Sequence, residues 1–584
     1  MRREHFDELT ARRDADVRVA HDWGSSLAAI QSAVDDLTSG GYVWVSKDSG
    51  PYPANADVLN LPSAVRVIGD GAEITAGSKD VEGGDTLVVT NDDITNGNDN
   101  ITLNGLDITG KVRIAADAAA GNYCSNITLD NVRCYDVPDF AFDLSDVMSG
   151  HIRRCYTSNA GVGGDDNGND GLHLTDSIGV YIEDYEADSG DDVLAVEANS
   201  LLSSLITINH VTGTSNVGDL VKFYTNPNTD VGDNIFGVSL VNPKADGGLN
   251  SAIEFENDGS GEIYDIGVRG LDAYDISSGI ISNDYTNVHH VRLYDCTIRR
   301  TQQSLLNLGK SWESYGGTYV AAGMSGNAYQ GVEFKAADAK LIGGEVGPAT
   351  NHVILASGDR FTVKDVTVDA LSQTIDGVTI NPAQGIRVNG LDGTVENNDV
   401  DADNDWAIGS SGTDAGTLVW NNTYITNGLG DGQFSSDAIL GSGLIGVVGY
   451  QSGDFIPLVY GSGVNTSDDD TTSSTYSTAT NGGDGIITWD HIQPSRGSVY
   501  CGYFGRIDLL NGSTMDVRVR NVTDGETICE RTGISSTGPF DIDPVAYTPT
   551  TTSSPIHYQA EIASTDGTNT VRLDDGSPVF GVQV

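Results

Sequence analysis

Short alternating runs of apolar and polar residues recur through the middle of the chain. Each run has two or three apolar residues at every second position, then a polar turn and a further apolar pair, as in ITLNGLDI, ITLDNVRC, VYIEDYEA, ITINHVTG and FTVKDVTV. Successive copies are separated by roughly 23–32 residues, and alternation at such a spacing is typical of strands in repeated units. The pattern therefore predicts the coils of a parallel β-helix.

Each copy has an apolar face too small to be buried alone, and stacking of successive copies would join these faces into one core. Glycine, asparagine and aspartate gather between the apolar runs, and the chain has 72 glycines. These residues suit tight corners, where the backbone needs positive φ or a side chain that bonds its own backbone. An ordinary β-sandwich is the alternative, but its turns recur about every 8–12 residues without a longer period.

One segment ahead of the repeats has helical periodicity. The apolar residues of SSLAAIQSAVDDLTSGG fall on one stripe, Leu27, Ile30, Val34 and Leu37. Ser25 or Ser26 is the expected N-cap, and Gly40–Gly41 is expected to end the helix. Such a helix would cap the open end of the coil stack and hide a strand edge that would otherwise recruit other chains.

The start of the chain resembles pectate-lyase-like right-handed parallel β-helix domains as they occur in tailspikes of tailed viruses. The matching elements, in order, are Ala29-Ile30-Gln31, Gly40-Gly41, Pro51-Tyr52 and Gly69-Asp70-Gly71. In place of the usual Asp-Gly-rich approach to the helix, this chain has His21-Asp22-Trp23-Gly24. With the repeats, the likeness covers about residues 15–430. It implies a parallel homotrimer and a role in binding the host surface.

The repeat pattern stops near residue 450, where a polar, low-complexity stretch begins. Alternating segments without the coil period follow, with turn signals such as Asn511-Gly512, as expected of an antiparallel jelly-roll-like β-sandwich. We therefore expect an all-β chain of four parts: an attachment segment (1–20), a helix cap with first strands (21–75), the β-helix (76–445) and the C-terminal sandwich (446–584).

The net charge of the chain limits the environments and partners that suit the protein. Acids outnumber bases 83 to 31, for a formal net charge of −52. Molar salt shortens the screening length to about 3 Å, so the simplest source is a halophile, and with the tailspike likeness a virus of a halophilic archaeon. A field this negative argues against nucleic acid. No apolar segment follows the N-terminal arginines, which predicts neither a secretory signal nor membrane insertion.

Two aspartate motifs carry the candidate chemistry. They resemble the Asn-Thr-Asp-Gly and Gly-Asp-Asp elements of polygalacturonase-type β-helix hydrolases, although the threonine is absent. The first element matches Asn169, Asp170 and Gly171, and the second matches Asp191 and Asp192 after a glycine. By that resemblance Asp191 is the general acid, and Asp170 and Asp192 hold the attacking water.

Physical chemistry makes such a trio coherent. Strands on adjacent coils lie about 4.8 Å apart, so acids on neighbouring or next-but-one coils fall near the roughly 6.5–9.5 Å that an inverting glycosidase needs. Crowded carboxylates cannot all ionise easily, so one of them would retain a proton near neutral pH and serve as the acid.

The later coils depart from the hydrolase pattern. Asp219 stands where the resemblance expects a histidine, and Glu254 and Glu256 stand where it expects cations that grip an acidic sugar. Polygalacturonate is thus an improbable substrate, whereas a neutral or amino sugar remains open. The expected substrate-binding residues are Asn169, Asp219, Tyr224, Glu254 and Glu256.

Other functions of the acids remain open. Asp165 and Asp166 could join the trio in holding Ca²⁺ through hard oxygen ligands, or the acids could cap coil corners; no other cofactor is expected. His173 and His210 are more typical of satisfied core or face histidines than of catalytic residues, and His289–His290 lacks a third metal ligand. Cys501 and Cys529 could form one disulfide.

Three functions compete. The first is a tailspike or tail-fibre-like receptor-binding protein on the virion, which recognises host glycans or an S-layer glycoprotein, contacts other tail or baseplate proteins and has or lacks depolymerising activity. The second is an inverting glycoside hydrolase, or a lyase, acting on a non-pectic polysaccharide, on a virion or free outside the cell. The third is a non-catalytic virion decoration. Sequence leaves open whether the chain is an enzyme.

Overall fold

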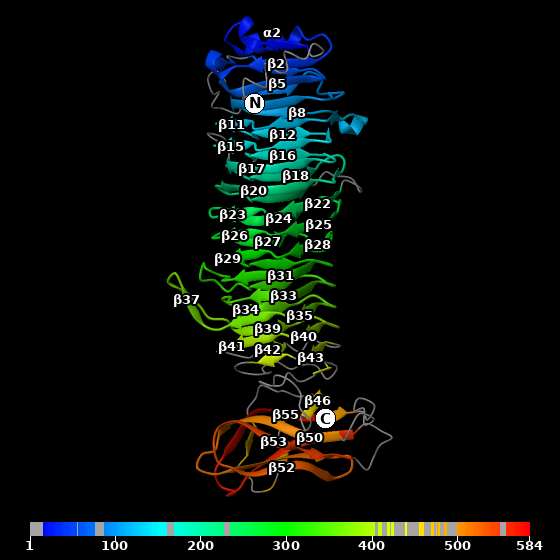
Figure 1. Ribbon diagram of the computed structural model, residues 1–584. Coiled ribbons are helices and arrows are strands. Elements are labelled where there is room, and N and C mark those ends of the chain that lie inside the picture. The colour runs from blue at the N-terminus through cyan, green and yellow to red at the C-terminus, as the bar shows by residue number, and fades with distance from the viewer. Residues whose placement is uncertain are drawn as a thin grey trace. The chain divides into compact units, whose positions relative to one another are not determined.

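The computed structural model describes residues 16–54, 57–75, 87–160, 169–226, 234–402, 407–410, 417–420, 422–424, 439–440, 455–460, 469–471, 475, 477–478, 484–487, 499–548 and 556–583. The described chain is all-β apart from one α-helix and short 3-10 turns, and it forms a parallel β-solenoid of about 14 turns (Figure 1). The predicted parallel β-helix is thereby confirmed. The chain divides into two compact units, Met1–Tyr319 and Val320–Val584.

One sheet of the first unit takes a single short strand from each coil, and its strands pair in parallel. These strands are β4 (Leu59–Leu61), β6 (Leu87–Asn91), β8 (Lys111–Ile114), β12 (Phe142–Ser145), β16 (Leu172–Thr175), β18 (Leu194–Ala198), β21 (Val221–Thr225), β24 (Ser251–Asn257), β27 (Ser278–Ser282) and β30 (Leu306–Leu308). Because all of them start at the same corner of the coil, residues that precede these strands stack along the solenoid.

The other strands of the coils form a second, longer sheet that bends at each coil corner. In the first unit it contains β1 (Val17–Val19), β2 (Gly41–Val45), β3 (Tyr52–Pro53), β5 (Val65–Thr75), β7 (Thr102–Thr109), β10 (Thr128–Asp130), β11 (Arg133–Tyr135), β14 (His151–Arg153), β15 (Tyr156–Ser158), β17 (Tyr181–Ser189), β19 (Ser203–Ser204), β20 (Thr207–Ser215), β22 (Ile235–Val241), β23 (Lys244–Asp246), β25 (Ile263–Arg269), β26 (Asp272–Tyr274), β28 (Val288–Tyr294), β29 (Thr297–Arg299) and β31 (Glu313–Val320). Two short strands, β9 (Cys124–Ser125) and β13 (Val147–Met148), pair beside it.

Alternation along each strand separates the core from the surface. In the first sheet Leu172, Leu194, Val221 and Ile253 are register partners, and all four are fully buried. The residue that follows each of them points to the opposite side of its strand. Because the sequence alternates, every second residue of a strand packs into the core, and the residues between them are available at the surface.

The coil corners use left-handed backbone, as the clusters of small polar residues predict. Asn131, Asp184 and Asp295 have φ of 53°, 52° and 51°, values that asparagine and aspartate tolerate better than other non-glycine residues. Leu205 is an exception, with φ of 54° and a side chain that is 63% exposed. A leucine there has neither the backbone freedom of glycine nor a buried contact in return.

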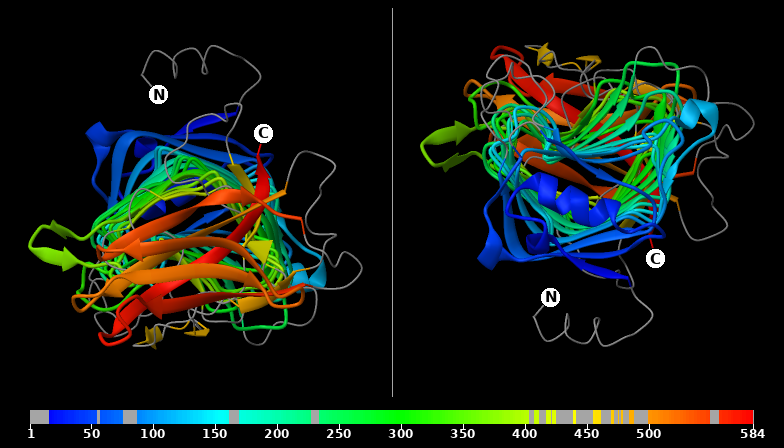
Figure 2. Two further views of the ribbon diagram at one scale, coloured as in Figure 1. Left: turned by 90° about the horizontal axis from the view of Figure 1, so that it is seen from below. Right: turned by 90° about the horizontal axis from the view of Figure 1, so that it is seen from above.

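The helix α2 (Leu27–Asp35) lies across the first coils (Figure 2). The four apolar residues of the predicted stripe are buried, although Leu37 lies beyond the end of the helix. Ser26 is its N-cap by position but makes no side-chain cap bond, and the helix ends at Asp35, before the glycine pair. Gln31 Oε1 accepts a hydrogen bond from Asn60 N at 2.7 Å, and Gln31 Nε2 donates to Asn60 O at 3.1 Å. These bonds use backbone groups of β4. No helix in the described residues is both long and apolar enough to cross a membrane.

Parallel coil strands are also present in the second unit. They are β32 (Val332–Phe334), β33 (Lys340–Val346), β34 (His352–Ala356), β35 (Thr362–Lys364), β36 (Thr367–Ala370), β39 (Gln384–Val388), β40 (Thr394–Glu396), β41 (Asp399–Ala402), β42 (Ile408–Ser410), β43 (Leu418–Trp420), β44 (Thr423–Tyr424) and β45 (Ile439–Leu440). A hairpin of β37 (Gln373–Ile375) and β38 (Val378–Ile380) interrupts them.

Two antiparallel sheets follow in this unit. One contains β46 (Phe455–Tyr460), β47 (Asp469–Thr471), β50 (Val499–Leu509), β53 (Gly538–Ala546) and β55 (Val571–Gln583), and the other β48 (Ser477–Thr478), β49 (Asp484–Ile487), β51 (Met515–Asn521), β52 (Glu526–Ile534) and β54 (Ile556–Ser564). Buried residues of both sheets form one hydrophobic cluster. It includes Cys501 and Cys529, which are free thiols.

Candidate functional site

Asp170, Asp191 and Asp192 gather at one corner of the coils, just before β16 and β18. One carboxylate oxygen from each lies within 4.8 Å of the other two. Asp170 and Asp192 are each 3% exposed, whereas Asp191 is half-buried. The two motifs meet because Leu172 and Leu194 are register partners, which puts the residue two positions before each at the same corner of adjacent coils.

Backbone hydrogen bonds continue this acid corner onto the next coil. Asp192 N donates to Asp170 Oδ1 at 3.1 Å, and Asp219 N donates to Asp192 Oδ1 at 2.8 Å. Asp170, Asp192 and Asp219 thus form a ladder in which the first two carboxyl groups each accept a backbone bond from the next coil. We call these three residues and Asp191 the acid ladder.

Gly171 explains why a glycine follows Asp170. A Cβ at this position would lie 2.5 Å from Tyr185 Oη, 2.7 Å from Ala187 Cβ and 2.7 Å from Val193 O. The strand after Asp170 therefore packs too closely on its neighbours for any side chain, and this close approach keeps the acids of successive coils together.

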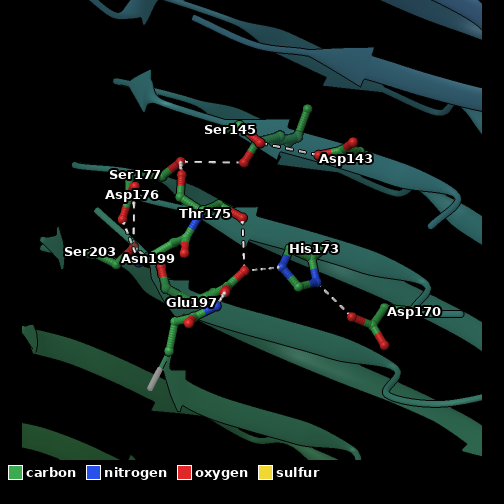
Figure 3. Close-up of polar contacts among 12 residues, drawn as sticks. Asp143, Ser145, Asp170, His173, Thr175, Asp176, Ser177, Glu197, Asn199 and Ser203 are labelled. Carbon is green, nitrogen blue, oxygen red and sulfur yellow. Dashed lines mark hydrogen bonds and ion pairs between the residues drawn. The ribbon is translucent and has the colours of Figure 1, made fainter. Parts of the chain in front are cut away.

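His173 on β16 bridges two carboxylates from neighbouring coils (Figure 3). Its Nδ1 lies 2.6 Å from Asp170 Oδ2, and its Nε2 lies 2.9 Å from Glu197 Oε2 on β18. The Phe140 ring stacks on the imidazole at a centroid distance of 4.3 Å. Burial opposes the imidazolium charge, but the hydrogen bonds to both carboxylates outweigh it and raise the pKa of His173 to about 10.

The pKa of the buried Asp192 carboxyl is shifted in favour of its protonated form. Burial raises its pKa well above the ordinary value, and the nearby charges of Asp170 and Asp191 add to the rise. Lys222, on the face of β21, opposes this shift.

A second group of acids surrounds Lys222 one coil further on. Lys222 Nζ lies 2.6 Å from Glu256 Oε2. Burial raises the pKa of Asp219 above its ordinary value, and the neighbouring carboxyl groups of Glu254 and Asp192 add to the rise. Asp219 Oδ1 has no hydrogen-bond partner within the described residues, although Asp219 is only 1% exposed.

The remaining predicted residues lie nearby. Asn169 is buried beside Asp170, and Tyr224 is half-buried in register with Glu197 and Glu256. Asp165 and Asp166 fall outside the described residues. Sequence reasoning took His173 for a satisfied core or face histidine and overlooked Glu197. The sequence feature that could have identified His173 and Glu197 is that both occupy outward positions of alternating strands directly after the aspartate motifs.

Aromatic rings on the coils offer little free area to a sugar. Phe223 and Trp312 are fully buried. Tyr264 stacks between Phe236 and His289, with ring centroids 5.2 Å and 5.5 Å away. Stacked in this way along the solenoid, the Tyr264 ring has both faces covered.

The geometry limits the chemistry. Spacing within 4.8 Å is shorter than the roughly 6.5–9.5 Å expected between acid and base of an inverting glycosidase. Three oxygens this close can share a proton, hold one water or sugar hydroxyl, or together ligate one cation. Among the described residues, the three aspartates are the single group of three or more potential metal ligands. The pair His289 and His290, whose Nδ1 atoms lie 2.8 Å apart, is not part of such a group.

Among solved structures, the chain is similar to phage tailspikes and to glycan-active parallel β-helix proteins. The A-module of a mannuronan C-5 epimerase from Azotobacter vinelandii has a TM-score of 0.37 at 14% identity, covering 74% of this chain and 100% of that one. Tailspike protein 3 of bacteriophage CBA120 has a TM-score of 0.39 at 12% identity, covering 76% and 64%. An exopolygalacturonase from Thermotoga maritima has a TM-score of 0.37 at 11% identity, covering 62% and 96%.

No protein-family model and no curated protein matches the sequence. Because the structural likenesses combine low identity with TM-scores under 0.5, they assign no activity to this chain. The function has to be argued from the acid ladder and its surroundings.

Proposed function

We propose that this chain is a tailspike-like, glycan-recognising protein and that the polysaccharide lies across the coil face that carries the acid ladder. The observation that supports this most is the convergence of Asp170, Asp191 and Asp192 at one corner, with two of the three buried. Burial of several acids costs free energy unless they are paired.

We further infer that the site cleaves the glycan it binds. The raised pKa of Asp192 beside Asp170 would supply an acid and a base within one site, at a separation closer to the roughly 5–5.5 Å of retaining glycosidases than to that of inverting ones. The polygalacturonase-type resemblance gives the acid role to Asp191, whereas burial favours Asp192. Substitution of each residue separately decides between them.

Charge points to a neutral or amino sugar as the substrate class. The face from β16 to β24 combines the acid ladder with Glu197, Glu254 and Glu256, against His173 and Lys222 as cations. The excess of carboxylates repels a polyanionic glycan and favours uncharged hydroxyls or amino groups. Asp219 Oδ1, a buried acceptor without a partner among the described residues, fits a site whose polar groups await a donor.

The finer points of the proposal concern the whole particle. The protein would be a virion appendage of a virus of a halophilic archaeon, assembled as a homotrimer and joined to other tail or baseplate proteins through residues 1–20. The bonds between Gln31 and β4 suit a capping role for α2. The two antiparallel sheets with their common core suit a sandwich at the C-terminal end. The four-part domain division remains part of this proposal.

The test is a glycan array probed with the full-length protein at molar salt, followed by measurement of reducing ends released from each bound polysaccharide. Asp192→Asn and Asp191→Asn are compared with Asp184→Asn, an exposed aspartate at a coil corner that serves as the control. We expect binding in all forms, release by wild type and Asp184→Asn, and loss of release when the acid is removed. Binding without release in the wild type would leave an attachment protein, and no binding would refute the proposal.

A further inference from the structure

His173 connects Asp170 of the acid ladder to Glu197, a residue that has no direct role in the proposed reaction. We propose that His173 is a positioning residue, which holds the Asp170 carboxylate in one fixed orientation between β16 and β18 and acts on the glycan only through Asp170. The inference rests on the proposed function of the acid ladder and deepens it.

Both oxygens of Asp170 are engaged. Oδ2 lies 2.6 Å from His173 Nδ1, and Oδ1 accepts the Asp192 backbone N–H at 3.1 Å. The second bond alone would let the carboxylate rotate and exchange its oxygens. With His173 in place, Oδ2 of Asp170 is bound to the imidazole and Oδ1 is directed toward the acid ladder. A bound sugar or water therefore always contacts Asp170 in the same orientation.

The imidazole is itself held from its far side. Its Nε2 lies 2.9 Å from Glu197 Oε2, an oxygen that also accepts a bond from Thr175 Oγ1 at 3.3 Å. Phe140 stacks on the imidazole ring, and Lys111 Nζ lies 5.3 Å from the centroid of Phe140. The ring of His173 is therefore fixed by two carboxylates and one aromatic face, and its side chain is only 12% exposed.

A second histidine offers a contrast within the same chain. His210 Nδ1 lies 2.9 Å from Asp184 Oδ1 on the preceding coil, but these side chains are 52% and 55% exposed. Neither residue contacts the acid ladder in any described interaction. His210 therefore makes the same kind of bond at the surface and serves as the matched control.

The experiment uses the full-length protein and whichever array polysaccharide yields the most reducing ends. We expect His173→Gly to lower kcat by about 100-fold or more with KM within about threefold, since a misplacement of about 1 Å in a catalytic group costs that much. Exogenous imidazole, which fits the space left between Asp170 and Glu197, should restore much of kcat. His210→Gly should change neither constant, with or without imidazole.

The results separate the inference from the function on which it rests. If wild type releases reducing ends and His173→Gly retains its kcat, or loses it without rescue by imidazole, positioning is refuted while the proposed function stands. If wild type cleaves no polysaccharide, hydrolysis fails and crystal structures of His173→Gly decide the inference. Asp170 displaced without imidazole and returned with it supports positioning, and Asp170 unmoved overturns it.

Discussion

The charge on His173 makes a prediction about folding that needs no substrate. Hydrogen bonds to Asp170 and Glu197 raise its pKa from 6.5 to about 10 against the opposing effect of burial. One pKa unit corresponds to about 1.4 kcal/mol, so this rise corresponds to at most about 5 kcal/mol of unfolding free energy. A base whose folded-state pKa is raised contributes its full stabilisation below the unfolded-state value, and the stabilisation disappears as pH climbs to the folded-state value.

The perturbation is His173→Gln, which removes the charge and keeps a polar side chain. We expect the unfolding free energy of wild type to exceed that of the variant by several kcal/mol at pH 6, with the difference shrinking steadily between pH 6.5 and about 10. Urea unfolding at constant molar salt measures both proteins across this range. His210→Gln is the control, because its exposed pair with Asp184 is worth about 0–1 kcal/mol.

If the difference in unfolding free energy between wild type and His173→Gln were the same at pH 6 and pH 10.5, the reasoning would be refuted. A constant difference would mean that His173 does not lose a stabilising charge in this pH range. A difference of similar size in His210→Gln would show that the imidazolium gains nothing from burial between two carboxylates.

Further predictions concern single positions. Asp192→Asn should unfold at a higher temperature than wild type at pH 8, because the raised pKa of the Asp192 carboxyl makes its contribution to stability fall as pH rises above about 4; a lower melting temperature would contradict this. Leu205→Asn should stabilise the chain by about 1 kcal/mol in urea unfolding, since leucine is unfavourable at positive φ. Gly171→Ala should destabilise it by about 1–3 kcal/mol through overpacking, and an unchanged urea midpoint would count against the close approach. Thiol titration of the denatured protein should find six thiols, Cys501 and Cys529 included; four would indicate a disulfide.

The sequence determined the architecture because the relevant interactions are local. Alternating apolar residues define which side of each strand is buried, and small polar residues such as Asn131 and Asp184 specify corners by their tolerance of positive φ. The meeting of Asp170 with Asp192 was also predictable, since their sequence separation of 22 amounts to one coil. Their spacing was not: one oxygen from each member of the trio lies within 4.8 Å of the others.

Only the tertiary structure decided which neighbours each surface residue has. Coils differ in length, so nothing local sets His173 beside Glu197 or Lys222 beside Glu256, and these pairs follow from the lateral register of β16, β18, β21 and β24. The raised pKa of Asp192 likewise depends on burial and on the neighbouring carboxyl groups of Asp170 and Asp191. The alternation of apolar and polar residues can be read from the sequence. The electrostatic environment of a residue depends on contacts between coils, which form only when the coils stack.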